Sequence, residues 1–417
     1  MAIEHKRPNL VRRINLMANT VGGAEYLVSL DPDDMLNVAK RTTGLADFGE
    51  RLTGDDSWRE AYYKMVECFE QQGDLNTLGR LMTRQEFIRF LRTRLMVVDA
   101  HLKNPSIREI AIEKPLFIVG NSRTGTTILH ELLALDPQLR APLAWETLHP
   151  VDLVDASVSR AELGECEQDI WADIVPEFAA VHEYSSYIPM ECLTMMGLEF
   201  TSGMGMIGKL DDFMLWRAGT DPQPGYRMHR LFLQLLQSQQ PTKNGQTYRW
   251  LLKSPVHLMT LTHLFTEYPD ANIIHTHRDP VKTVASTIST VTTTRYIRTD
   301  NPDPSVLAQN VVLGFQIGLE MIYQHRQDGT LPDQQIADLH YSDFMTNAVN
   351  AIGDSYQKLN RPFTRDLEQA MQHYLDHKPQ GKHGKHRYSP EDFGLSREAL
   401  REQFSTYMNA YGVKENV

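Results

Sequence analysis

Residues 115–135 read PLFIVGNSRTGTTILHELLAL, and this stretch decides the fold. It opens with a short apolar run bounded by a proline and a glycine, which is typical of a fully buried strand. Its last nine residues have the apolar pattern of a helix, which we expect to end before the Asp-Pro pair that follows. A strand, a glycine-bounded loop and a helix in this order predict an α/β fold with a central, mostly parallel sheet flanked by helices.

Further units of the same kind follow along the chain. We expect a strand and a helix in each of three stretches, YRWLLKSPVHL at 248–258, ANIIHTHRDPVKTVASTIS at 271–289 and IADLHYSDF at 336–344. No internal repeat or long low-complexity segment separates them. The sequence therefore predicts a single α/β domain over residues 111–417.

The first 110 residues have a different pattern of apolar residues. The acids of DPDD at 31–34 suit a helix N-terminus. The stretches 58–71 and 84–102 carry apolar residues at three- and four-residue steps, as amphipathic helices do. Residues 1–110 are therefore predicted to form a helical N-terminal extension packed on the core.

Residues 150–245 have no clear period and are rich in methionine and tyrosine. Two interpretations stay open for them. One is an adaptable apolar cover on the acceptor side of a binding cleft, and the other is a core of mixed helices.

Composition limits the partners and the compartment. The 417 residues carry a formal net charge of −11, so the chain as a whole repels nucleic acid and anionic surfaces. Three scattered cysteines indicate neither a disulfide framework nor a thiolate zinc site. We expect no signal peptide, no transmembrane segment and a cytoplasmic protein.

The loop after the first strand has the chemistry of a phosphate site. Gly120 and Gly125 stand at the separation of the two Walker A glycines, and the backbone N–H groups of such a turn point at a bound anion. The position of the Walker lysine is Thr126, which argues against handling of a γ-phosphate. Arg123 inside the turn supplies a cation for the oxygen of a leaving phosphate.

This loop resembles the 5′-phosphosulfate loop of sulfotransferases that use 3′-phosphoadenosine 5′-phosphosulfate (PAPS), whose usual forms are P-K-S-G-T-T and P-R-[ST]-G-T-T. Here S-R-T-G-T-T carries serine at the proline position, which changes the stiffness of the turn and not its ligand chemistry. The resemblance is to the bacterial and tyrosylprotein-sulfotransferase-like types. It implies that the 5′-phosphosulfate is bound by Ser122, Arg123, Thr124, Gly125, Thr126 and Thr127.

A second motif lies about 150 residues further on. Arg278 ends a predicted strand, Asp279 is placed to cap the next helix, and Ser286 follows two turns into that helix. From the residues alone, helix capping and a surface salt bridge explain this pattern nearly as well as a phosphate site. The pattern resembles the sulfotransferase 3′-phosphate motif R-[DN]-P-x-x-x-x-x-S, which implies that Arg278 and Ser286 bind the 3′-phosphate.

Three weaker matches complete the resemblance. Lys253 stands where the family has a strand-end lysine that contacts the sulfuryl group, and Tyr341 stands in a structural Y-x-D-[LF] segment. The stretch 381–387 resembles the family's G-x-x-G-x-x-K loop, so Gly384, Lys385 and Arg387 are expected to close over the nucleotide. No metal is predicted, because the histidine spacings match no ligand pattern.

Sulfuryl transfer needs a base for the acceptor and positive charge on the leaving oxygen. Arg123 and Lys253 are the candidates for the charge. Glu146 is the predicted base, by resemblance to tyrosylprotein and N-sulfo types of sulfotransferase that use a glutamate from this stretch. His257 is the second candidate for the base, and His182 the third.

The sequence thus predicts transfer of a sulfuryl group from PAPS to a hydroxyl or amine of a small, aryl or lipid-like acceptor. Two alternatives fit these residues less well. A P-loop nucleotide kinase lacks its lysine here, and a non-catalytic nucleotide-binding protein would lack a base beside the sulfuryl group.

Overall fold

The computed structural model describes residues 5–152, 157–180, 185–201, 207–378 and 388–415. At its centre is a five-stranded sheet in the order β2-β3-β1-β4-β5, in which every neighbouring pair is parallel. Its strands are β1 (Leu116–Val119), β2 (Leu139–Arg140), β3 (Arg249–Lys253), β4 (Asn272–His277) and β5 (Ile336–His340). The predicted fold class is confirmed. The two-residue strand β2 was not predicted.

The strand order brings distant segments to one edge of the sheet. β1 lies between β3 and β4, with Ile118 opposite Lys253 on one side and Ile274 on the other. The strands are parallel, so the loops that follow all three leave the sheet at the same carboxyl edge. The chain goes from β1 to one side of the sheet and later returns to the other, and such a switch point is where open α/β sheets bind ligands.

Side chains of β1 alternate between two buried layers. Leu116 and Ile118 pack with the helices α7 (Thr126–Leu133), α18 (Ala348–Lys358) and α19 (Arg365–His377). Phe117 and Val119 face the opposite layer, which contains α14 (Leu261–Glu267), α15 (Pro280–Tyr296) and α16 (Pro304–Gln327). The sheet is therefore covered on both faces, as a parallel sheet requires.

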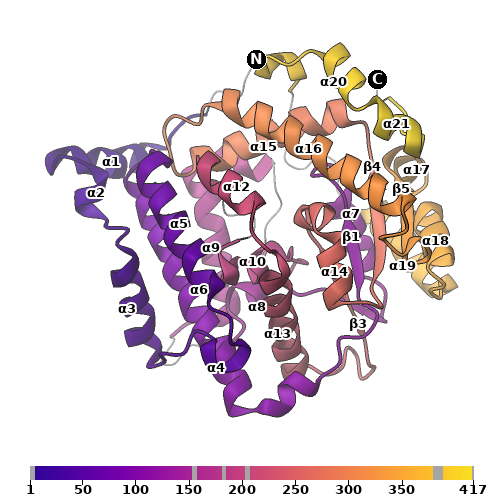
Figure 1. Cartoon of the computed structure of the whole chain (residues 1–417), viewed down its shortest axis with the longest axis horizontal. Helices are drawn as coiled ribbons and strands as arrows, with labels where there is room; N and C mark the ends of the chain where they lie inside the picture. Colours follow the sequence, from indigo (N-terminus) through magenta and orange to yellow (C-terminus); the bar gives the residue numbers. More distant parts are fainter. Residues whose placement is uncertain (1–4, 153–156, 181–184, 202–206, 379–387, 416–417) are drawn as a thin grey trace.

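The first hundred residues form the helical extension that the sequence predicts, at the left of Figure 1. Asp31 caps one helix by accepting a hydrogen bond from the backbone N–H of Asp34 at 2.9 Å, as the acids of DPDD indicated. Two long helices of the extension share one apolar cluster with Phe117 of the sheet. The helices are α1 (Asn9–Met17), α2 (Ala24–Leu27), α3 (Pro32–Thr43), α4 (Glu50–Thr53), α5 (Ser57–Gln72) and α6 (Thr77–Lys103).

The segment between β2 and β3 is mostly helical. Tyr226, Phe232 and Leu236 of its longest helix are buried in the main apolar cluster, so this part is a core helix. The helices are α8 (Ala144–Leu148), α9 (Arg160–Ile174), α10 (Leu193–Met196), α12 (Asp211–Ala218) and α13 (Gln223–Gln239).

One helix is more apolar than we expected. By length and composition, α16 is long and apolar enough to cross a membrane. The sequence predicts no such segment. Its side chains Leu307, Val311, Leu319 and Ile322 are buried in the main cluster. One side of α16 therefore packs as a core helix does, while its residues Val306, Leu313 and Ile317 are exposed.

The C-terminal part closes the sheet at its β5 edge. It comprises α17 (Tyr341–Thr346), the two helices already named on that face, α20 (Arg397–Gln403) and α21 (Ser405–Tyr411). Tyr407 of α21 is hydrogen-bonded to His277 at the end of β4. The sequence predicts one short final helix, whereas the structure has two, α20 and α21.

Candidate active site

The loop between β1 and α7 has the backbone of a phosphate-binding turn. Gly120 is required because a Cβ there would collide with the hydroxyl of Thr276 on β4. Gly125 precedes α7 with φ +86°, a left-handed conformation that glycine adopts without strain. Arg123 adopts φ +70°, which is uncommon for a residue with a side chain and is found mostly at functional turns.

Hydrogen bonds inside the loop fix this conformation. The buried hydroxyl of Thr124 donates to the carbonyl oxygen of Asn121 at 2.8 Å and lies 2.6 Å from the hydroxyl of Thr276. The hydroxyl of Thr276 donates in turn to the carbonyl oxygen of Val119 at 3.3 Å. The hydroxyl of Thr124 therefore holds the loop on the sheet. Because that hydroxyl is already hydrogen-bonded, the backbone N–H of Thr124 is the group that could bind an anion.

The two predicted nucleotide motifs meet across the carboxyl edge. Arg123 Nε donates to the hydroxyl oxygen of Ser286 at 3.1 Å, although 163 residues separate them. Arg278 donates to the backbone carbonyl of Arg123 at 2.6 Å. Asp279 caps α15 through the N–H of Val281, as predicted. The structure thus brings Arg123, Arg278 and Ser286 together.

An aromatic ring supports the second arginine. The guanidinium of Arg278 lies 3.9 Å from the ring centroid of Tyr341, which is cation–π distance. The same ring approaches Gly125 so closely that a Cβ there would lie 3.1 Å from it. The Nε of Arg278 is buried and has no hydrogen-bond partner among the described residues, so this guanidinium keeps donor capacity for an anion.

Lys253 ends β3 and points into the same edge. Its side chain is 5% exposed, and its ammonium forms a hydrogen-bonded ion pair with Glu191, whose side chain is 21% exposed. The N–H of Cys192 donates to the carbonyl oxygen of Lys253 at 2.9 Å, which fixes the segment that carries Glu191 on the strand end. Glu191 is not predicted from the sequence, because it is part of no motif and no periodic apolar pattern.

The charge of Lys253 also affects the pKa of a histidine on α7. Burial, and after it the charge of Lys253, lower the pKa of His130 to about 3. His130 lies one turn into the helix that begins at the phosphate loop. The helix α7 packs on β3, the strand that ends at Lys253.

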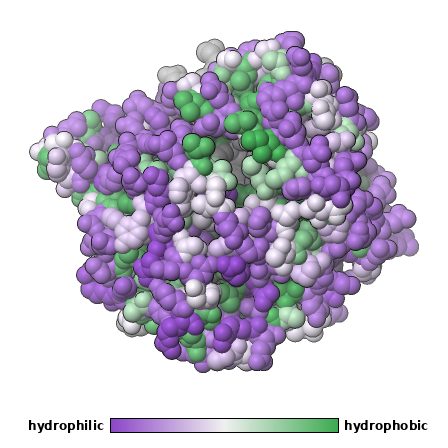
Figure 2. Space-filling view, viewed as in Figure 1, coloured by the Kyte–Doolittle hydropathy of each residue, from purple (hydrophilic) through white to green (hydrophobic). Residues whose placement is uncertain are grey.

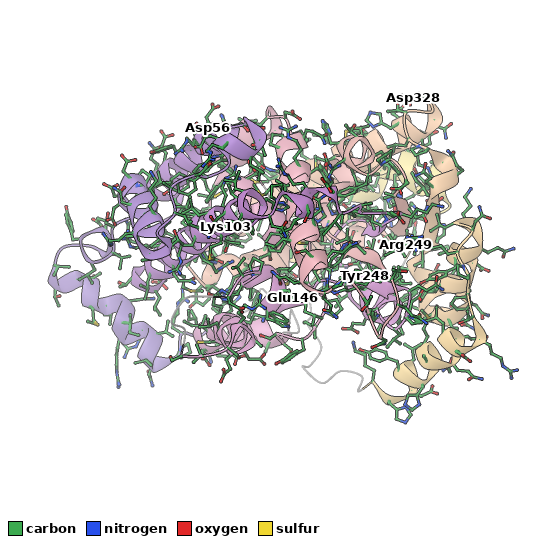
Figure 3. All side chains as sticks on the ribbon, turned by 90° about the horizontal axis from the view of Figure 1, so that it is seen from below. Asp56, Lys103, Glu146, Tyr248, Arg249 and Asp328 are labelled. Atoms are coloured by element: carbon green, nitrogen blue, oxygen red, sulfur yellow. The ribbon has the colours of Figure 1, made fainter. Side chains whose placement is uncertain are left out.

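Glu146 is committed to other contacts. One carboxylate oxygen pairs with Arg140, and the other accepts the N–H of Leu143 at 2.8 Å, so that Glu146 caps α8. Arg140 also donates to the hydroxyl of Tyr248 at 3.0 Å, and Figure 3 labels both Glu146 and Tyr248 in the body of the molecule. Glu146 is 5% exposed. Its burial disfavours Glu146 as the base, because little of its carboxylate is open to an acceptor hydroxyl.

His257 lies away from the carboxyl edge, which corrects its placement as the second candidate for the base. After β3 the chain forms the short 3-10 helix η5 (Pro255–Met259), which turns His257 into the core, where it packs edge-on against Phe117. Its Nδ1 is hydrogen-bonded to the hydroxyl of Tyr226 at 2.8 Å. Burial holds the pKa of His257 well below its ordinary value.

Several predicted residues lie outside the described part of the chain. These are His182 and the loop residues Gly384, Lys385 and Arg387. The described ends of that loop lie beside the nucleotide motifs, since Lys378 pairs with Glu131 of α7 and the short helix η7 (Pro390–Phe393) packs on α15. In the phosphate loop, Ser122 and Thr126 are half-buried and Thr127 is exposed at the start of α7.

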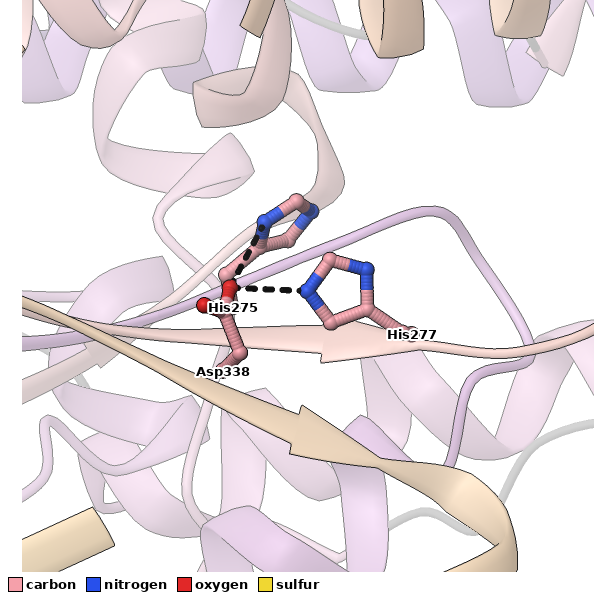
Figure 4. Close-up of side chains that lie close together, drawn as sticks. All are labelled: His275, His277 and Asp338. Carbon is pink, nitrogen blue, oxygen red and sulfur yellow. Dashed lines mark hydrogen bonds and ion pairs between the residues drawn. The ribbon is translucent and has the colours of Figure 1, made fainter. Parts of the chain in front are cut away.

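A group of potential metal ligands, two buried histidines and an exposed aspartate, lies under the Arg278 motif (Figure 4). His275, His277 and Asp338 have ligand atoms within 4.8 Å of one another. His277 contacts Asp338 at 2.9 Å through Nε2 and Tyr407 through Nδ1, and Arg326 donates to both oxygens of Asp338. The arginine places a positive charge where a cation would bind. Hydrogen bonds with each other, Tyr407 and Arg326 account for His277 and Asp338, whereas both ring nitrogens of His275 are buried without a hydrogen-bond partner among the described residues.

The described site therefore combines three cations with oriented donors. Arg123, Arg278 and Lys253 lie at one edge of the sheet, together with the hydroxyl of Ser286 and the N-terminus of α7. Such a set binds a multiply charged phosphate or sulfate ester. Glu191 is the carboxylate in direct contact with one of these cations.

Comparison with known proteins agrees with this geometry. A family model described as "Sulfotransferase family" matches residues 115–366. The crystal structure of sulfotransferase STF1 from Mycobacterium tuberculosis H37Rv is 27% identical, has a TM-score of 0.72 and is matched over 90% of this chain and 98% of that one. Sulfotransferase STF9 from Mycobacterium avium has the same fold, with a TM-score of 0.80 at 24% identity over 92% of this chain and 97% of that one.

A curated relative matches over a short stretch. Omega-hydroxy-beta-dihydromenaquinone-9 sulfotransferase Stf3 from Mycobacterium bovis is 49% identical over 41 residues. The match covers 10% of this chain and spans 11% of that relative's length.

Proposed function

The chain belongs to the sulfotransferase family, and on that premise we propose that it transfers a sulfuryl group from PAPS to a hydroxyl of a lipid-like acceptor. The observation that carries the proposal is the convergence of Arg123, Arg278 and Ser286 from two loops. A nucleotide with phosphate at both ends of its ribose needs cations in two loops, and this site provides them.

The residues present fit such a donor. The buried Nε of Arg278, which has no partner in the described part of the chain, suits a 3′-phosphate, together with Ser286. The backbone N–H groups of the β1–α7 loop, with Arg123, suit the 5′-phosphosulfate. When bound, PAPS supplies an activated sulfuryl group on a good leaving phosphate. Arg123 and Lys253 would stabilise the negative charge that grows on the leaving oxygen.

We assign the role of general base to Glu191, in place of Glu146. The carboxylate of Glu191 is partly exposed and contacts the ammonium that would face the sulfuryl group, whereas the carboxylate of Glu146 is buried in an ion pair with Arg140. In the proposed step the acceptor hydroxyl gives its proton to Glu191 as its oxygen bonds to sulfur. The bond from sulfur to the bridging oxygen breaks, and the electron pair stays on 3′,5′-ADP.

The lipid-like acceptor is supported by a relative. Stf3 is named for a menaquinone derivative that carries an omega-hydroxyl group, which is an apolar chain ending in an alcohol. We also place the protein in the cytoplasm, because Cys68, Cys166 and Cys192 are all free.

The test is transfer of labelled sulfur from PAPS to an ω-hydroxy polyprenyl quinone and to a phenol, with two matched variants. Glu191→Gln removes the carboxylate that pairs with the cation at the carboxyl end of β3. Glu113→Gln removes the carboxylate that pairs with Arg249 at the opposite end of that strand. We expect Glu191→Gln to lower kcat by at least about 100-fold, with unchanged affinity for 3′,5′-ADP, and Glu113→Gln to change neither.

Near-normal turnover by Glu191→Gln would contradict the assignment of the base. If Glu146→Gln abolished turnover instead, with nucleotide binding intact, Glu146 would be the base, as the sequence predicts. Transfer to neither acceptor by the unmodified protein would contradict the proposed acceptor class.

A further inference from the structure

Exposed apolar side chains are concentrated at the N-terminal end of the described chain. Seventeen large hydrophobic residues are exposed in the described part of the molecule, and six of them fall within residues 10–27. They lie on α1, on α2 and on the turn between these helices, which together project at the upper left of Figure 1. We call residues 9–27 the N-terminal tip. Its exposed apolar residues are Leu10, Leu16, Met17, Val21, Tyr26 and Leu27.

The tip is fixed on the body by its other face. Val11 and Ala18 are buried, and Val11 packs in a cluster with residues of α6 and α9. The carbonyl oxygen of Asn15 accepts from the hydroxyl of Thr77, and its side-chain oxygen accepts the N–H of Leu78, each at 3.1 Å. The exposed apolar side chains therefore belong to a docked segment with a defined outer face.

The tip and the four residues before it are basic in an acidic protein. Residues 5–27 contain four Lys or Arg residues and a single Glu, whereas the whole chain has a net charge of −11. Lys6, Arg12 and Arg13 are exposed and have no ion-pair partner among the residues that the structure describes, while Arg7 pairs with Asp300. The outer face of the tip thus joins apolar side chains to Arg12 and Arg13, which have no ion-pair partner in the described part of the chain.

This combination selects one kind of partner. A second copy of the chain would bring this basic surface against an identical basic surface across a twofold axis, where like charges repel. An anionic bilayer surface accepts both features, since apolar side chains enter the interface while Lys and Arg contact the headgroups. In Figure 2 the projection carries apolar and intermediate residues beside hydrophilic ones.

We propose that the N-terminal tip is a peripheral docking surface for anionic phospholipid bilayers. The whole chain repels such a surface, so the contact is local and holds the molecule by this end. The proposal rests on the tip alone and does not depend on the transfer reaction. It would bring the enzyme to the place where a lipid-like acceptor resides.

The test is co-sedimentation of the full chain with vesicles of phosphatidylcholine alone and of phosphatidylcholine with 30% phosphatidylglycerol, a composition set at roughly the charge density to which basic segments respond. We expect binding to the anionic vesicles that weakens with salt. Arg12→Glu/Arg13→Glu and Leu10→Ser/Met17→Ser should each lower the partition coefficient at least about tenfold.

Matched controls stand elsewhere on the surface. Arg41→Glu/Arg51→Glu changes two exposed arginines on α3 and α4, and Leu313→Ser/Ile317→Ser changes two exposed apolar residues on α16. Both controls should bind vesicles like the unmodified chain, and all variants should keep their affinity for 3′,5′-ADP, which shows that they are folded. Equal binding by tip variants and controls would overturn the proposal. So would a dimer in sedimentation equilibrium that the tip variants dissociate.

Discussion

The guanidinium of Arg278 donates a hydrogen bond of 2.6 Å to the backbone carbonyl of Arg123, and so joins the end of β4 to the loop after β1. The contact links two segments that are 155 residues apart in the chain. It makes the conformation of the phosphate loop depend on the residue that we propose for the 3′-phosphate.

The first prediction concerns this link. Arg278→Ala should weaken the binding of 3′,5′-ADP by about 100-fold, because it removes charge-assisted hydrogen bonds worth about 1.5–3 kcal/mol each. Arg249→Ala, an exposed arginine at the other end of the sheet, serves as the control and should leave the affinity unchanged. Titration calorimetry measures both. Equal affinities for the two variants would remove Arg278 from the nucleotide site.

The second prediction separates backbone strain from collision in the phosphate loop. Gly125 and Gly245 both have positive φ, at +86° and +77°, but a Cβ at Gly125 would press on Tyr341, whereas one at Gly245 would meet nothing within 4 Å. Gly245→Ala should cost about 1 kcal/mol of unfolding free energy and leave nucleotide affinity unchanged. Gly125→Ala should cost more and should also weaken nucleotide binding.

Chemical denaturation and nucleotide titration of the two glycine variants provide the comparison. If Gly125→Ala lost no more stability than Gly245→Ala and bound 3′,5′-ADP normally, the packing of Tyr341 under the loop would have no role in the site.

The third prediction is a loss of stability in mild acid. Burial lowers the pKa of His130 and of His229 to about 3, whereas an unfolded histidine titrates near 6.5. Between these values the unfolded chain binds more protons than the folded one, so the free energy of unfolding falls as the pH drops through this window. The limiting slope is about 1.4 kcal/mol per pH unit for each histidine.

Urea denaturation at pH 7.5, 6.5 and 5.5 measures this slope. His130→Gln should reduce it, and His373→Gln, at an exposed position, should not. Burial would raise the pKa of Asp338, but hydrogen bonds from His277 and Arg326 lower it well below its ordinary value, so its contribution is lost only below about pH 4. Stability that is constant from pH 7.5 to 5.5 would contradict the buried neutral state of these histidines.

The sequence predicts most of the framework, because its strands are short apolar runs and some of its helices begin at a capping residue. All of β1, β3, β4 and β5 fall inside predicted stretches, and Asp279 caps α15 as its motif indicates. The strand β2 is not predicted, because two residues are too few to show an alternating apolar pattern. The order of strands also has no local signal, since it depends on which faces the helices cover.

The sequence predicts the site less completely, because a motif does not specify the direction in which a side chain points. Lys253 and His257 are four residues apart, yet the 3-10 turn after β3 leaves the lysine at the cleft and buries the histidine against Phe117. Glu191 has no motif and becomes visible only through its ion pair with Lys253. Contacts between segments, which no spacing rule contains, determine both outcomes.

The most direct test of PAPS-type donor recognition is the affinity of the unmodified protein for three nucleotides. Titration calorimetry should show that 3′,5′-ADP binds about 100-fold more tightly than 5′-AMP, since the added phosphate gains Arg278 and Ser286. It should also bind more tightly than ATP with Mg²⁺, because the loop has Thr126 where a nucleotide kinase has lysine. Equal affinity for 5′-AMP and 3′,5′-ADP, or tighter binding of ATP with Mg²⁺, would contradict the account.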